Sequence, residues 1–315
     1  MRTNWPGSAI LVPVAVLALV LVLLPLGFPS IYFYRVAALI CIFALVAVGL
    51  NVLMGFTGQV SLGHAAFIGV GGYAAAIGPT YLGLPSWLAV IAGALLSALA
   101  ALAVGQPILR LKGHYLAVAT LGFGILVAMV LTNEVAWTGG PDGMPVPRLV
   151  LFGWRVHGAS TWYWISAGLL VFGTWLTLNL GASPAGRALH AIHGSEIAAR
   201  VCGVDIARYK LAAFVLSAVY ASIAGSVLAL LNGYITPDNA SFLRSVEVVT
   251  MVALGGLGST FGAIVGAAAL IILPQLLTAF NEYENLLLGV LIVVFMVFFR
   301  GGVVPAIARL ARRAA

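Results

Sequence analysis

Charged side chains are scarce in this chain of 315 residues: Asp, Glu, Lys and Arg make up 7% of it, whereas 63% of the residues are hydrophobic. A soluble domain carries about 25% charged residues. Three stretches contain no charged residue at all, 3–34, 36–109 and 248–281. Since a membrane-spanning helix needs about 20 apolar residues, this scarcity argues against a soluble domain and predicts several crossings of a lipid membrane.

The apolar segments lack the alternation that a membrane β-barrel would show in segments of about ten residues. Residues 11–20, for example, are apolar on every side, which favours helices. Glycine, proline and charge clusters divide the chain into about ten predicted spans within one transmembrane domain, 1–315. These are 8–28, 34–54, 62–80, 87–109, 114–132, 161–181, 210–231, 245–258, 261–279 and 286–300.

Several kinds of chemistry have no candidate residues. The two lysines, Lys112 and Lys210, lie outside any Gly-Lys-Ser/Thr nucleotide-binding loop. Glu247 is the one acid expected near membrane depth, so a proton relay is not indicated. His190, His193 and Glu196 have a spacing that zinc would tolerate, but Gly194 interrupts the helix between them, and we expect no metal site. Any uphill transport would therefore need energy from another chain.

The net charge of +7 reflects sidedness rather than binding to nucleic acid. With ten spans, eleven of the fifteen basic residues fall on one side, which predicts that this side is cytoplasmic and holds both termini. The apolar run 8–28 exceeds the about 7–15 residues of a signal-peptide core, so we expect it to be retained. On the cytoplasmic side we expect a loop at about 182–209 and a tail at about 301–315. On the outer side we expect a loop at about 133–160.

Two glycine-rich segments, 55–69 and 254–262, interrupt the apolar sequence, and each follows an apolar run. They predict either close helix packing through small residues or broken helices that line a pathway. We assign the pathway hypothesis to these residues: Gly58, Gln59, Ser61, Gly63, His64, Gly255, Gly256 and Gly258.

Each long loop contains a local signal. Inside, Ser195 is a good N-cap and Glu196 suits a first helical turn, which predicts a short amphipathic helix that ends at Gly203 and docks a partner; a solvated loop is the alternative. Outside, residues 138–143 form a turn-rich sequence, TGGPDG, that either only orders the loop or also receives a partner.

The segment 51–67, NVLMGFTGQVSLGHAAF, resembles the signature of permeases from bacterial branched-chain amino acid ABC importers. Residues 138–143 and 252–263 resemble the same family in the same order. The chain is more similar to the larger-loop member of the two-permease pair. The resemblance implies a bundle like that of type II ABC importers in the inner membrane, a second homologous permease, two cytoplasmic ATPases and a periplasmic binding protein, with ATP and magnesium held by the ATPases alone.

The resemblance also implies roles for the loop residues. Glu196, Ala198, Ala199 and Gly203 match the cytoplasmic motif that packs on the ATPase, with Ile197 as a departure from it, and we add the neighbouring Arg187 and Arg200. The expected docking residues for the binding protein are Thr138, Gly139, Gly140 and Asp142.

Alternating access is the mechanism that we expect. Three alternatives remain open: a permease for urea or short amides, a stand-alone secondary carrier, and a membrane enzyme, for which only scattered His, Ser and Glu are available.

Overall fold

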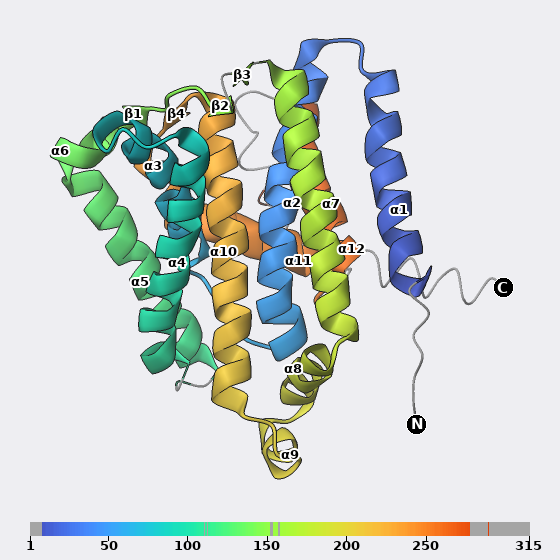
Figure 1. Ribbon diagram of the computed structural model, residues 1–315. Coiled ribbons are helices and arrows are strands. Elements are labelled where there is room, and N and C mark those ends of the chain that lie inside the picture. The colour runs from blue at the N-terminus through green and yellow to red at the C-terminus, as the bar shows by residue number, and fades with distance from the viewer. Residues whose placement is uncertain are drawn as a thin grey trace.

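The computed structural model describes residues 8–109, 111, 113–151, 154–156, 158–277 and 289, and this part of the chain is almost entirely helical (Figure 1). The long helices are α1 (Ser8–Leu23), α2 (Ile31–Thr57), α3 (His64–Tyr81), α4 (Ser86–Ile108), α5 (His114–Asn133), α7 (Ala159–Ala182), α10 (Ile206–Asn232), α11 (Phe242–Gly255) and α12 (Thr260–Leu277).

Shorter elements connect them. They are the helices α6 (Val135–Thr138), α8 (Pro184–Gly194) and α9 (Glu196–Val201), the 3-10 turns η1 (Leu24–Gly27), η2 (Gly140–Asp142) and η3 (Pro237–Ala240), and the two-residue strands β1 (Met144–Pro145), β2 (Val150–Leu151), β3 (Trp154–Arg155) and β4 (Tyr234–Ile235). The strands form two antiparallel pairs, β1 with β4 and β2 with β3.

Six segments within the described residues are long and apolar enough to cross a membrane: 10–27, 31–57, 86–108, 114–133, 159–182 and 206–232. They correspond to six of the ten predicted spans. The predicted spans 62–80, 245–258 and 261–279 coincide with α3, α11 and α12, which are shorter or less apolar. The span 286–300, apart from residue 289, and the tail 301–315 lie outside the described residues. The count of ten therefore stays a prediction.

Helices α2 and α10 form the centre of the bundle. Every residue of α2 from Cys41 to Thr57 is buried, as expected of a helix that is apolar on all sides. Helices α1, α4 and α5 instead leave many leucine and valine side chains exposed, among them Leu95 and Leu99. Since lipid is the solvent expected for such faces, these three helices lie at the outside of the bundle.

Small residues bring α3 and α10 into backbone contact. A Cβ added at Gly71 would overlap the carbonyl of Ser222, and one at Gly225 would overlap the carbonyl of Ile68. The Ser226 hydroxyl donates to the Gly71 carbonyl at 2.8 Å. This is the small-residue packing expected of membrane helices.

The two long loops lie at opposite ends of the bundle (Figure 1). Helix α6 and the strands cover one end, where strand β1 pairs with strand β4. Helices α8 and α9 cover the other end. The two long loops thus lie far apart, and which end faces the cytoplasm stays a prediction from the charge pattern.

Candidate functional site

The two glycine-rich interruptions contact each other. Helix α2 ends where Gly58 takes a left-handed conformation, with a φ of 72°. The Asn51 side-chain oxygen accepts a hydrogen bond from the backbone N–H of Gly258 at 2.9 Å, and a Cβ at Gly55 would overlap that same nitrogen. Gly256 and Gly258 also have positive φ values of 110° and 82°. Segments about 200 residues apart therefore meet through backbone that only glycine accommodates.

Helices α3 and α11 both begin inside the bundle. The Nε2 of His64, the first residue of α3, lies 2.5 Å from the hydroxyl of Ser217, which is near the middle of α10. The backbone N–H of Ala65 donates to the Ser245 hydroxyl in the first turns of α11 at 3.0 Å. The amino ends of two broken helices thus lie together halfway between the two ends of the bundle.

The predicted pathway residues that follow Gly58 are mostly enclosed. His64 is completely buried, and its Nδ1 lies 2.9 Å from the Ser61 hydroxyl. Gly63 fits against the carbonyl of Thr120 so closely that a Cβ would overlap it. In this conformation Gly63 packs against α5 and His64 joins α3 to α10.

Gln59 differs from these residues. It is buried, yet neither atom of its side-chain amide has a hydrogen-bond partner among the described residues. It lines a cavity of about 220 Å³ together with Gly58, Val60 and the first turn of α5, and Glu196 and Lys210 complete the wall. Of the predicted pathway residues, Gly58 and Gln59 line this cavity.

An ion pair lies at the level where the broken helices meet. Arg244 Nη1 donates to Glu247 Oε2 at 2.5 Å, and the Arg244 guanidinium lies 5.3 Å from the ring centre of Phe43, near the middle of α2. With ten spans, Arg244 counts among the four basic residues on the outer side, and its side of the membrane stays a prediction. The chain enters the bundle through η3, where Ala240 packs against Gly69 of α3, so α11 starts deeper than its sequence indicates.

The inner loop folds into two helices, of which the sequence predicted the second. Ser195 caps α9 as expected, since its hydroxyl accepts from the Ala198 N–H at 3.3 Å. Helix α8, before it, is capped by Ser183 and packs on the end of α2, with the ring of His190 4.6 Å from that of Phe56. Partial burial, and secondly the neighbouring His193, lowers the pKa of His190.

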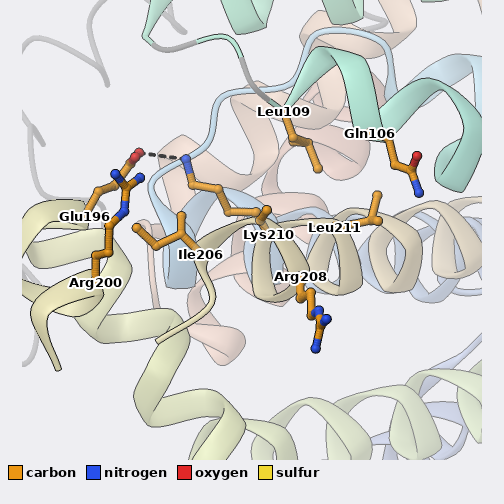
Figure 2. Close-up of a pocket in the computed structure, with 9 residues that line it drawn as sticks. Gln106, Leu109, Glu196, Arg200, Ile206, Arg208, Lys210 and Leu211 are labelled. Atoms are coloured by element: carbon orange, nitrogen blue, oxygen red, sulfur yellow. Dashed lines mark hydrogen bonds and ion pairs between the residues drawn. The ribbon is translucent and has the colours of Figure 1, made fainter. Parts of the chain in front are cut away.

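An ion pair fixes α9 to α10 (Figure 2). The Lys210 Nζ donates to Glu196 Oε1 at 2.6 Å, and only 6% of the lysine side chain is exposed. The pair borders a second cavity of about 470 Å³, whose other walls include Gln106 and Leu109 at the end of α4. Ile192, Ala199 and Ile206 pack together beneath α9. The short helix is therefore bound to α10 by charge and by apolar contact.

The predicted coupling residues differ in burial. Ala199 is buried and Glu196 is half-buried, whereas Arg187, Ala198, Arg200 and Gly203 are exposed. The most exposed apolar side chains of α9, Ile197 at 80% and Val201 at 83%, were not among the predictions. Their i, i+4 spacing on one helix face was the signal available in the sequence.

The predicted outer docking residues are largely structural. Thr138 and Gly140 are buried, and the Thr138 hydroxyl donates to the Leu131 carbonyl at 2.7 Å. Asp142 is exposed, and its carbonyl accepts from the Tyr234 hydroxyl at 2.7 Å. Of this set, Asp142 has the one charged side chain, and it is exposed.

Apolar helices around a buried centre, broken helices that meet midway and a small cavity beside them define a multi-pass helical membrane protein of the kind that a permease would require. Comparison with known families agrees. Residues 32–296 match the family described as the permease component of branched-chain amino acid transport systems, and the chain belongs to this family.

Named relatives support the assignment. LivM of Escherichia coli strain K12, a permease protein of a high-affinity branched-chain amino acid transport system, is 35% identical over 294 residues, which cover 86% of this chain and 69% of LivM. LivH of the same strain and system is 25% identical over 285 residues, 83% of this chain and 90% of LivH. LsrC of Klebsiella pneumoniae, a permease protein of an autoinducer 2 import system, is 32% identical over 172 residues, 52% of this chain and 48% of LsrC. No solved structure matches the chain.

Proposed function

We propose that this chain is the larger permease subunit of an ABC importer that carries leucine, isoleucine and valine across the bacterial inner membrane. The observation that carries the proposal is the 35% identity to LivM over 86% of the chain. The chain serves as the transport subunit, and separate ATPase subunits hydrolyse ATP bound with magnesium; the permease itself holds no cofactor.

The assembly that we propose contains a second homologous permease, two cytoplasmic ATPases and a periplasmic amino acid-binding protein. Similarity to both LivM and LivH, two permeases of one transport system in one bacterium, supports pairing with a second permease. The chain forms one transmembrane domain, 1–315, of about ten spans in a type II-like bundle with both termini in the cytoplasm. The separation of the loop 133–160 from α8 and α9 in Figure 1 supports opposite docking faces.

The mechanism is alternating access around the broken helices. The loaded binding protein docks on the outer loop, whose turn Thr138, Gly139 and Gly140 shape and where Asp142 is exposed, and the amino acid then passes the contact between Gly58–His64 and Gly255–Gly258. A discontinuous backbone is expected where a membrane protein lines a path. The direct contact between Asn51 and Gly258 supports a joint movement of both interruptions.

Energy enters through α9. Its exposed face, Ile197, Arg200 and Val201, meets the ATPase, with Arg187, Ala198 and Gly203 beside it. Glu196 and Ala199 transmit the movement inward, because the bond from Glu196 to Lys210 ties α9 to the first turns of α10. Since α10 is a central helix, its displacement reaches His64 through Ser217.

The substrate is tested by uptake in a bacterial strain that lacks its own branched-chain amino acid importers, with this chain and its partner subunits expressed together. We expect uptake of labelled leucine that isoleucine and valine inhibit and that excess urea or acetamide leaves unchanged. Urea uptake without leucine uptake would instead establish the short-amide alternative.

A further inference from the structure

Arg244 and Glu247 form the charged part of an otherwise apolar face of α11. Their side chains are 31% and 46% exposed, and Leu243 and Val246, which are also exposed, lie beside Glu247 on the same half of the helix. A helix repeats every 3.6 residues, so these four positions share one arc of its surface. This surface combines two opposite charges with aliphatic side chains.

The depth of this ion pair sets a physical condition on its surroundings. Contact with Phe43 places Arg244 beside the middle of α2, and the bond from Ala65 to Ser245 places the same turn beside the start of α3. Charged side chains at membrane depth are costly and face a bundle interior or a water-filled cavity rather than lipid. The exposed side of the pair therefore borders the path or the second permease.

The ion pair leaves hydrogen-bonding capacity unused. Arg244 Nη1 bonds to Glu247, but the Arg244 Nε is buried and has no hydrogen-bond partner among the described residues. A guanidinium offers five N–H donors in a planar fork that matches a carboxylate. Glu247, being the more exposed partner, has carboxylate lone pairs open to a second donor.

We propose that Arg244 and Glu247 bind the two charged ends of the transported amino acid, the carboxylate at Arg244 and the ammonium at Glu247, with its branched side chain against Leu243 and Val246. This inference rests on the proposed function. The zwitterion replaces one internal ion pair by two intermolecular ones, so no uncompensated charge arises at membrane depth. A neutral amide has no charged ends to exchange, which makes the site selective for amino acids.

The test measures equilibrium binding of three tritiated ligands to the purified complex of both permeases and the ATPases, without the binding protein. The ligands are leucine, leucinamide, which lacks the carboxylate, and 4-methylpentanoate, which lacks the ammonium group. Arg244→Met should weaken leucine and 4-methylpentanoate by about 10- to 100-fold and leave leucinamide unchanged. Glu247→Gln should weaken leucine and leucinamide and leave 4-methylpentanoate unchanged.

The Asp205–Arg208 pair supplies the matched control, because it has the same i, i+3 spacing at 3.0 Å but lies at the start of α10. Asp205→Asn and Arg208→Met should bind all three ligands like the wild type.

Equal losses for all ligands in the Arg244 and Glu247 variants, or loss of the second permease from the complex, would show a structural or interface pair and overturn the proposal. Wild-type leucine uptake with unchanged binding in both variants would overturn the site alone. A wild-type complex that transports no branched-chain amino acid would overturn the proposed function as well.

Discussion

At the scale of single residues, the site depends on positions where no side chain fits. Gly55 and Gly258 allow α2 and the α11–α12 turn to meet, and Asn51 then satisfies a backbone N–H that would otherwise be unpaired in an apolar interior. An unsatisfied buried donor costs about 1–3 kcal/mol. These residues therefore contribute to both the shape and the stability of the interruption.

Gly55→Ala should destabilise the purified protein by about 1–3 kcal/mol, the usual cost of overpacking, because the new Cβ would overlap the Gly258 nitrogen and the Asn51 side chain. Thermal unfolding in detergent measures the change. Gly122→Ala in α5 is the matched control, since no atom lies within 4 Å of its added Cβ. Equal melting temperatures for the two variants would contradict the close contact.

The sequence indicated some of these residues and missed others for a physical reason. The glycines and Ser195 carry local signals, which are backbone freedom and N-capping. Asn51 looks like any polar residue within a span until the fold brings Gly258 to it. The depth of Arg244 likewise depends on where η3 leads the chain, which no local pattern encodes.

At the scale of elements, the inner loop is two helices joined to the bundle by separate contacts. Helix α8 packs on Phe56 of α2, and α9 is bound to α10 through the Glu196–Lys210 pair. The sequence predicted α9, because its cap and its glycine stop are local. It did not predict α8, whose helical structure depends on Ser183 and on packing against α2.

Glu196→Gln should weaken the link between α9 and α10, because it leaves the buried Lys210 ammonium without a charged partner. We expect the stimulation of ATPase activity by the loaded binding protein to fall at least severalfold in the assembled importer. Lys210→Met should lower it too, and the exchange Glu196→Lys with Lys210→Glu should restore part of it. Arg208→Met, an exposed neighbour on α10, should retain full stimulation. Full stimulation in Glu196→Gln would show that the pair does not transmit the movement.

Most long helices could be predicted from apolar length alone, and the observed α2, α4, α5, α7 and α10 lie close to the expected spans. The pattern does not give depth, however. Helices α3 and α11 begin beside the middle of α10 and α2, a consequence of tertiary contacts at Ser217 and Phe43. Apolar periodicity is the same for a helix that starts at the surface and for one that starts inside.

At the scale of the whole molecule, the proposed orientation places α8 and α9 in the cytoplasm. The native cysteines report on this directly, because Cys202 follows α9 and is exposed, whereas Cys41 is buried in α2. A membrane-impermeant maleimide should label the protein in inside-out vesicles and leave it unlabelled in intact spheroplasts. Cys202→Ser should abolish the signal. Labelling of Cys202 in intact spheroplasts would reverse the orientation.

The central claim is that this chain is a transport subunit and that ATP hydrolysis in partner subunits drives the transport. The most direct measurement is uptake of tritiated leucine into proteoliposomes that contain both permeases and the ATPases, with the loaded binding protein outside and ATP inside. We predict accumulation that requires hydrolysable ATP and stops when the ATPases are omitted. Accumulation by this chain without ATPases, driven by an ion gradient, would contradict the account and identify a stand-alone carrier.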